Sequence, residues 1–174
     1  MQHTLVALVE DKPGVLNRVS SLFRRRAFNI ESLTVGHTEQ SGVSRMTIVI
    51  DNTQTNAERV IANLYKQVNV IQVADLRDAP MVSRDLALIK VSAPSERRSE
   101  VMQLVDVYRA RIVDVTNESL IIETTGDEDK VNSLVDVLRP FGIMEMVRTG
   151  IVAMARGGDP NPKVNGNGNG NGKH

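Results

Sequence analysis

The stretch VEDKPGVLNRVSSLFRRRAFNIESLTV, from Val9 to Val35, decides the fold that the sequence predicts. It begins at the end of an apolar run, reaches a turn at Pro13 and Gly14, and ends in a second run typical of a strand. Pro13 suits a first helical turn, because its missing N–H would have no helical partner there. Between the runs, apolar residues recur at helical spacing: Val15, Val19, Leu22 and Phe23.

The segments around this stretch predict a β-α-β-β-α-β order for residues 1–78. HTLVALVE precedes the first helix, and GVSRMTIVID follows the second strand after a turn at residues 40–42. TNAERVIANLYKQV predicts a second helix, in which Thr55 and Glu58 have capping-box spacing. Its apolar stripe is Val60, Ile61, Leu64 and Val68. VNVIQVADL then predicts the closing strand.

Residues 83–156 repeat the same order after a linker at 79–82. DLALIKVSA, ARIVDVT, SLIIETT and IMEMVRTGIVAMA predict strands, and SERRSEVMQLVDVY and DEDKVNSLVDVLRPF predict helices. Each half has about 75 residues, close to the lower comfortable size of a domain. The order is that of a ferredoxin-like domain, so we predict an α+β fold of two tandem ferredoxin-like βαββαβ domains, each an antiparallel sheet with two helices on one face.

Two further segments bear on this organisation. The run Leu5–Val9 has no polar alternation, which indicates a strand covered on both faces. The tail GGDPNPKVNGNGNGNGKH, residues 157–174, alternates Asn and Gly and has almost nothing to bury, so we expect it to be disordered.

Composition excludes several classes of function. The chain has 174 residues, 41% of them hydrophobic, and its 21 basic and 21 acidic residues give no net charge, so nothing favours nucleic acid or a membrane as partner. It has no cysteine, which excludes disulfides and thiolate metal sites. No apolar run approaches the roughly 20 residues that span a bilayer, and the N-terminus has no secretory pattern, so a cytoplasmic location is expected.

The turn at Pro13 and Gly14 has the chemistry of a small binding site. A helix starting there leaves backbone N–H groups without helical partners, which suits a carboxylate, and Gly14 has no side chain to block the approach. Asp11 can accept from an ammonium group, and Asn29 offers donors and an acceptor. The predicted effector-binding residues are Asp11, Gly14, Val15, Leu16, Asn29, Ile30, Leu33 and Val35. The alternative is a plain turn, with Pro and Gly as punctuation.

Other candidate residues point to no chemistry of their own. His3, His37 and His174 lack metal-ligand spacing and are expected at the surface. The acidic cluster at 127–129 can bind a cation or favour a helix dipole, and the run Arg24–Arg26 suits a helix C-terminus. We predict no catalytic residue and no metal site.

The motif D-x-P-G-V-L after a first strand, with Asn29 opening the second, resembles the ACT domain, a ferredoxin-like regulatory module that binds amino acids. VEDKPGVL, FNIESLTVG and SRMTIVID, with IVDVT and RTGIVAMARG further on, are similar to the small regulatory subunits of acetohydroxyacid synthase, also called acetolactate synthase. This resemblance covers residues 2–156 and makes the two domains an N-terminal ACT domain and an ACT-like C-terminal domain.

The resemblance implies a regulatory subunit that is not an enzyme by itself. It implies activation of a catalytic large subunit and feedback inhibition by valine, with isoleucine and leucine as alternatives. Thiamine diphosphate, Mg and FAD are expected only on that large subunit. It also implies a homodimer through the ACT domains, in which the partner supplies Asn29, and the apolar strand 28–38 is expected at a sheet edge open to pairing. The alternatives are an amino acid sensor of another biosynthetic enzyme and a small nucleic-acid-binding protein.

Overall fold

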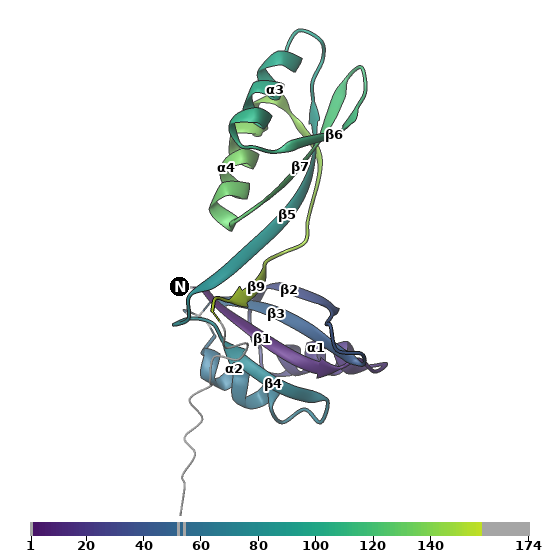
Figure 1. The fold of residues 1–174 in the computed structure, drawn as a ribbon. Coiled ribbons are helices and arrows are strands. Elements are labelled where there is room, and N and C mark those ends of the chain that lie inside the picture. The colour runs from purple at the N-terminus through teal and green to yellow at the C-terminus, as the bar shows by residue number, and fades with distance from the viewer. Residues whose placement is uncertain (1, 52, 54, 158–174) are drawn as a thin grey trace, which may run out of the picture. The chain divides into compact units, whose positions relative to one another are not determined.

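The computed structural model describes residues 2–51, 53 and 55–157, which form two compact units (Figure 1). One unit contains residues 2–82 together with 153–157, and the other contains residues 83–152. The expected disordered tail lies, apart from Gly157, outside the described residues.

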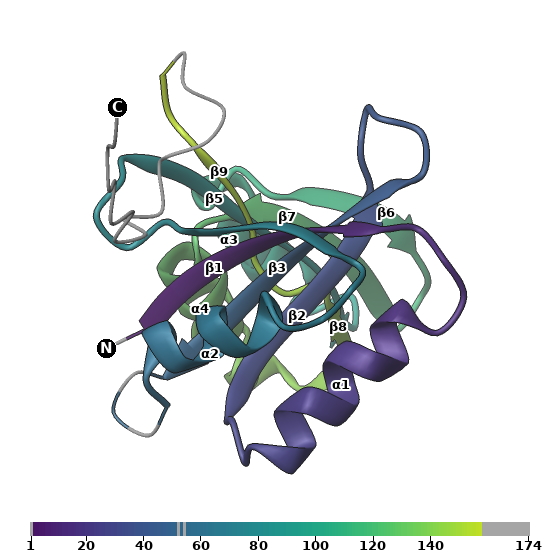
Figure 2. The ribbon, with the colours of Figure 1, turned by 90° about the horizontal axis from the view of Figure 1, so that it is seen from below.

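The first unit is one antiparallel sheet with two helices on one face (Figure 2). The strand order is β2-β3-β1-β4, so β1 lies inside the sheet. β2 lies at an edge, as the sequence predicts. Its elements are β1 (Gln2–Glu10), α1 (Val15–Arg25), β2 (Ile30–His37), β3 (Val43–Asp51), α2 (Ala57–Leu64) and β4 (Val70–Asp75).

The second unit repeats this topology, with strand order β6-β7-β5-β8. The predicted tandem of ferredoxin-like βαββαβ folds is therefore confirmed. The elements are β5 (Met81–Ser92), α3 (Arg98–Val107), β6 (Arg111–Val115), β7 (Ser119–Gly126), α4 (Glu128–Leu138), the 3-10 turn η1 (Arg139–Phe141) and β8 (Ile143–Arg148), and β9 (Val152–Ala155) pairs with β5.

The apolar stripe of α1 belongs to the first core. Val15, Val19, Leu22 and Phe23 are all at most 6% exposed, as their helical spacing predicts. They share this core with alternate residues of β1 and β3, such as Leu5, Ala7 and Ile48, which are fully buried. Val6 and Val49, on the other side of the sheet, are also buried, so β1 is covered on both faces as expected.

The second helix begins one residue later than its capping-box pattern predicts. Asn56 is the N-cap and accepts from the Arg59 N–H at 3.1 Å. Thr55 is not the cap, because its buried hydroxyl accepts from the Asn29 N–H at 3.0 Å. The helix ends at Leu64, so Val68 lies beyond it and is 94% exposed instead of belonging to the stripe.

The closing strand predicted in the second half is two strands. Gly150, between β8 and β9, has a φ of 82°, a left-handed conformation that interrupts extended backbone. Residues 153–157 join the first unit instead of the second: Ala153 is 5% exposed and its carbonyl accepts from Arg45 Nη2 at 2.7 Å. The expected linker 79–82 is also shorter, because β5 begins at Met81.

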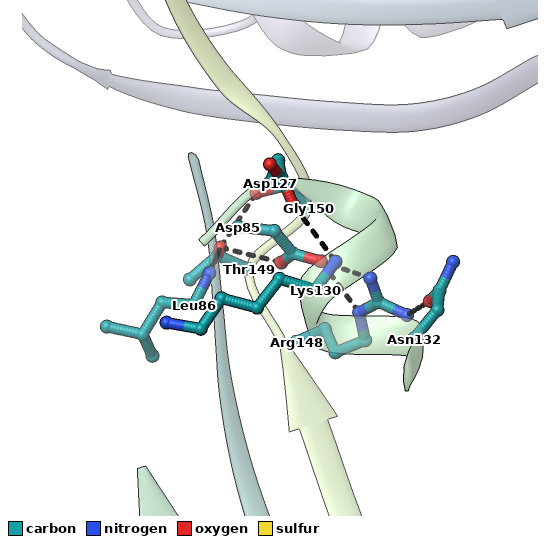
Figure 3. Close-up of polar contacts among 8 residues, drawn as sticks. All are labelled: Asp85, Leu86, Asp127, Lys130, Asn132, Arg148, Thr149 and Gly150. Atoms are coloured by element: carbon teal, nitrogen blue, oxygen red, sulfur yellow. Dashed lines mark hydrogen bonds and ion pairs between the residues drawn. The ribbon is translucent and has the colours of Figure 1, made fainter. Parts of the chain in front are cut away.

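A buried ion pair ties β5 to β8 in the second unit. Asp85 is 2% exposed, and Arg148 Nε donates to its Oδ2 at 2.7 Å while Nη2 of the same guanidinium contacts the same oxygen (Figure 3). Arg148 Nη1 donates to Asn132 Oδ1 of α4 at 2.7 Å. Because Asp85 is buried and Arg148 is its charged partner, removing either charge leaves the other uncompensated.

We expect Arg148→Met to lower the free energy of unfolding by about 3–5 kcal/mol, because it leaves the Asp85 carboxylate buried without its partner. The measurement is urea unfolding of the whole chain followed by circular dichroism. Arg139→Met is the matched control, since Arg139 pairs with Asp136 at 3.1 Å with both side chains about 70% exposed, and such pairs contribute about 0–1 kcal/mol. Equal losses in the two variants would contradict this role of Asp85.

Candidate functional site

Gly14 forms the N-terminal cap of α1 and turns the chain away from β1. Its φ is 84° and no side chain caps the helix there. A Cβ at this position would meet no atom within 4 Å, so the space above the turn is open. The helix begins at Val15, so Pro13 lies before its first turn, whereas the sequence analysis expects it in that turn.

The amides at the start of α1 are not equally available. The Val15 N–H donates to the Lys12 carbonyl at 3.3 Å. It is therefore not free, although the sequence analysis expects unpaired N–H groups at this helix start. In the described part of the chain, the Gly14 and Leu16 N–H groups have no backbone acceptor. The helix start therefore offers two amides beside open space, which is enough to bind one carboxylate.

Asp11 lies beside these amides and contacts the end of β2. Its Oδ2 is 3.2 Å from Nδ1 of His37, and both side chains are exposed. The Asp11 N–H donates to the Gly42 carbonyl at 2.8 Å, which holds the turn against the β2–β3 connection. Sequence analysis gives His37 no role, and only the pairing of β2 with β3 brings it here.

A second carboxylate lies next to the turn and is absent from the sequence-based prediction. Asn69 Nδ2 donates to Glu10 Oε2 at 2.6 Å, and Lys12 Nζ lies 3.0 Å from the same oxygen. The Asn69 hydrogen bond, followed by the Lys12 contacts, lowers the pKa of Glu10. The guanidinium of Arg18 donates to Asn69 Oδ1, so this asparagine joins the carboxylate to α1.

The predicted apolar residues separate into two groups. Leu16 and Val35 are 47% and 41% exposed and can contact a ligand, whereas Ile30 and Leu33 are half-buried against the core. Val15 is 4% exposed, because its side chain belongs to the core stripe of α1.

Asn29 does not join the other predicted residues within one chain. It precedes β2, whereas His37, beside Asp11, ends it. A strand rises roughly 3.3 Å per residue, so the two ends of β2 are more than about 20 Å apart. The Asn29 N–H is bound to Thr55, and its side chain is exposed at the far end of the sheet. Within one chain, the turn and Asn29 are therefore separate surfaces.

The remaining candidate positions have structural roles. Asp127 caps α4 by accepting from the Lys130 N–H at 2.9 Å, as the helix-dipole interpretation of the acidic cluster requires. His3 is 2% exposed, which contradicts its expected surface position; it lies on β1, inside the sheet. His174 lies outside the described residues. Over residues 2–51, 53 and 55–157, no three metal-ligating side chains gather, and no helix is long and apolar enough to cross a membrane.

Comparisons with known proteins match both units. Residues 5–72 fit the AHAS small subunit-like ACT domain, and residues 84–157 fit the small subunit of acetolactate synthase. A probable acetolactate synthase small subunit of Archaeoglobus fulgidus is 54% identical over 157 residues, covering 90% of this chain and 98% of that protein. The acetolactate synthase small subunit of Mycolicibacterium smegmatis is 50% identical over 155 residues, covering 89% and 91%.

A solved structure shows the same arrangement of elements. The crystal structure of the acetolactate synthase small subunit from Thermotoga maritima aligns with a TM-score of 0.84 at 40% identity, and the alignment covers 91% of this chain and 99% of that one. The similarity therefore extends through both units.

The contact between Asn69 and Glu10 predicts a pH effect. In Asn69→Ala, we expect the pKa of Glu10 to rise toward its ordinary value, because the hydrogen bond that favours the carboxylate is lost. A carboxylate whose pKa is lower in the folded chain than in the unfolded chain stabilises the fold at pH values above its unfolded-state pKa. This stabilisation is lost as the pH falls through the folded-state pKa. The variant should therefore lose more stability at neutral pH than in acid.

Carboxyl NMR titration measures the Glu10 pKa, and urea unfolding at the two pH values measures the stability. Asn63→Ala is the control, since the Asn63 amide binds the Arg59 carbonyl and not a carboxylate. An unchanged Glu10 pKa in Asn69→Ala would show that the hydrogen bond does not set it.

Proposed function

This chain belongs to the family of acetolactate synthase small subunits, and we propose that it activates the thiamine-diphosphate-dependent catalytic subunit and makes it sensitive to valine. Family membership gives it the role of a regulatory subunit. The observation that carries the effector proposal is the open, left-handed turn at Gly14, with two amides, a carboxylate and exposed apolar side chains around it. The catalytic steps are assigned to the large subunit, and the cytoplasmic location remains a prediction.

The turn suits the charged end of an α-amino acid. The N–H groups of Gly14 and Leu16 receive its carboxylate, and the positive end of the α1 dipole favours the same charge. The Asp11 carboxylate receives the ammonium in place of the exposed His37 ring. Both charges of a zwitterion thus meet opposite charges, whereas a simple anion would lie beside an uncompensated carboxylate.

A branched apolar side chain completes the fit. Leu16 and Val35 are the exposed apolar groups nearest in sequence to the turn and the end of β2, and Leu33 and Ile30 continue along the same strand. Covering Leu16 and Val35 with the ligand removes apolar surface from water, which favours valine, isoleucine or leucine over polar amino acids, whereas Ile30 lies beside Asn29 at the other end of β2.

Pairing between two chains explains how Asn29 can take part. β2 is an edge strand, and an open edge can pair with the same edge of an identical chain. A two-fold axis makes that pairing antiparallel, so the Asn29 end of one β2 lies beside the His37 end of the other. We therefore propose a homodimer through the ACT domains, with Asn29 of one chain completing the site at Gly14 of the other.

The second unit lacks an equivalent site. Its sequence at this place is SAPSERR, and Arg98 Nη2 donates to the carbonyls of Ala93, Thr116 and Asn117 at 2.6–3.0 Å. A cation bonded to three carbonyls occupies the place where the first unit has an open glycine turn. We assign effector binding to residues 1–78, and valine then regulates the complex through its different affinities for two arrangements of it.

We expect Gly14→Asp and Asn29→Ala each to weaken valine inhibition about ten-fold or more. Gly14→Asp puts a negative group at the carboxylate position, and Asn29→Ala removes charge-assisted hydrogen bonds worth about 1.5–3 kcal/mol each. The measurement is acetolactate formation by the holoenzyme over a valine titration. Both variants should still activate the large subunit, and the chain alone should form no acetolactate.

The control is Gly157→Asp, since Gly157 also has a positive φ of 93° and open space around it but lies outside the turn. It should leave valine sensitivity unchanged. If Gly14→Asp and Asn29→Ala holoenzymes remain as sensitive as the parent, valine binds elsewhere.

Mixing the two variants tests whether Asn29 acts across the dimer. A mixed dimer of one Gly14→Asp chain and one Asn29→Ala chain has one site with Gly14 and Asn29 both intact and one site with neither. Calorimetric valine titration of the exchanged mixture should therefore recover tight binding that each variant alone lacks. Light scattering checks that the chains are dimers. No recovery from chains that exchange would place Asn29 outside the site of its partner.

A further inference from the structure

We propose that the cleft between the C-terminal ends of α1 and α2 is a second binding site, which takes a compact anion with two or more negative charges on oxygen atoms. The cavity has a volume of about 340 Å³, at the lower end of the range for small-molecule sites. It is lined by Leu22, Arg25, Arg26, Asn63, Lys66 and Gln67.

The charged side chains that line this cleft are all positive. Three of its six lining residues are cationic and none is a carboxylate. Within the described residues, Arg25, Arg26 and Lys66 form no ion pair with an acidic side chain. The whole chain carries no net charge, so three unpaired cations around one cavity are a local concentration. Their mutual repulsion is relieved when an anion lies between them.

The helix dipoles do not account for all of this charge. α1 ends at Arg25 and α2 ends at Leu64, so both C-terminal ends meet the cleft. Each end carries roughly half a negative charge, and two ends offset about one of the three cations. An excess of about two positive charges remains, which is what a divalent anion would neutralise.

The polar lining supports oxyanion binding. Arginine forks match the oxygen pairs of phosphate and carboxylate, and Lys66 adds a compact point charge. The Gln67 side chain has no hydrogen bond within the described residues, so its amide N–H groups are available as further donors. Leu22, 4% exposed, is the one apolar residue among the six.

The same lining favours a compact anion over a nucleotide. None of the six residues is aromatic, so a nucleobase would have only the guanidinium planes of Arg25 and Arg26 to stack on. The charge and the size of the cavity instead fit a phosphate-type anion such as pyrophosphate, or a small polycarboxylate such as citrate. Both classes share the same clustered oxygen charge, and only binding measurements separate them.

The cleft is distinct from the turn at Gly14. α1 has eleven residues, and at roughly 1.5 Å per residue its two ends are about 16 Å apart. Variants at the turn should therefore leave anion binding intact, and the two proposals can fail separately.

The test is calorimetric titration of the full-length chain with pyrophosphate and with citrate at low ionic strength. We expect saturable binding of at least one of them, weakened by added salt. Lys66→Gln and Arg26→Gln should each weaken it about ten-fold, because each removes one charge-assisted contact. Gly14→Asp should bind the anion as the parent does.

Arg24→Gln is the matched control, because Arg24 belongs to the same arginine run but does not line the cavity. It should bind like the parent, and thermal unfolding should show every variant folded. Absence of saturable binding up to millimolar pyrophosphate and citrate would overturn the proposal, as would an equal loss in Arg24→Gln. Tighter binding of adenosine triphosphate than of tripolyphosphate would overturn the assignment to compact anions.

Discussion

The antiparallel register of β1 on β3 is the constraint on which the first unit depends. Glu10 pairs with Val43 and Gln2 pairs with Asp51, so the two strands match from end to end. A slip of one residue would move every core side chain to the opposite face. The same register places the turn after β1 against the β2–β3 connection, through the hydrogen bond from the Asp11 N–H to the Gly42 carbonyl.

The two ends of helix α1 differ in the polar groups that they present. Its first turn contains no acidic residue, so the positive end of its dipole and its free amides remain available to a ligand. Its last turn contains Arg24 and Arg25, and with Arg26 and Lys66 these give its other end more positive charge than the dipoles require. The two proposed sites therefore use opposite ends of one helix whose apolar face is wholly committed to the core.

The two units share one topology but differ at the turn before their first helix. In the first, the turn before the helix is left open by a glycine in the left-handed conformation. In the second, Arg98 occupies the corresponding place with bonds to three carbonyls, and the Asp85–Arg148 pair holds β5 and β8 together. Binding needs open polar groups and stability needs satisfied ones, so a fold repeated in tandem can have one open unit and one closed unit.

Local sequence determined the order of the elements and the residues of the core. Apolar spacing identified the stripe of α1, and the Pro-Gly pair identified the turn, because helix period and turn chemistry depend on neighbours in the chain. Only the tertiary structure decided which residues surround that turn. Asn69 donates a hydrogen bond to Glu10 from 59 positions away. The Thr55 hydroxyl accepts from the Asn29 N–H instead of capping α2, and residues 153–157 belong to the first unit. These contacts depend on strand register and on competition for hydrogen-bond partners between distant segments, and no local pattern in the sequence encodes either of them.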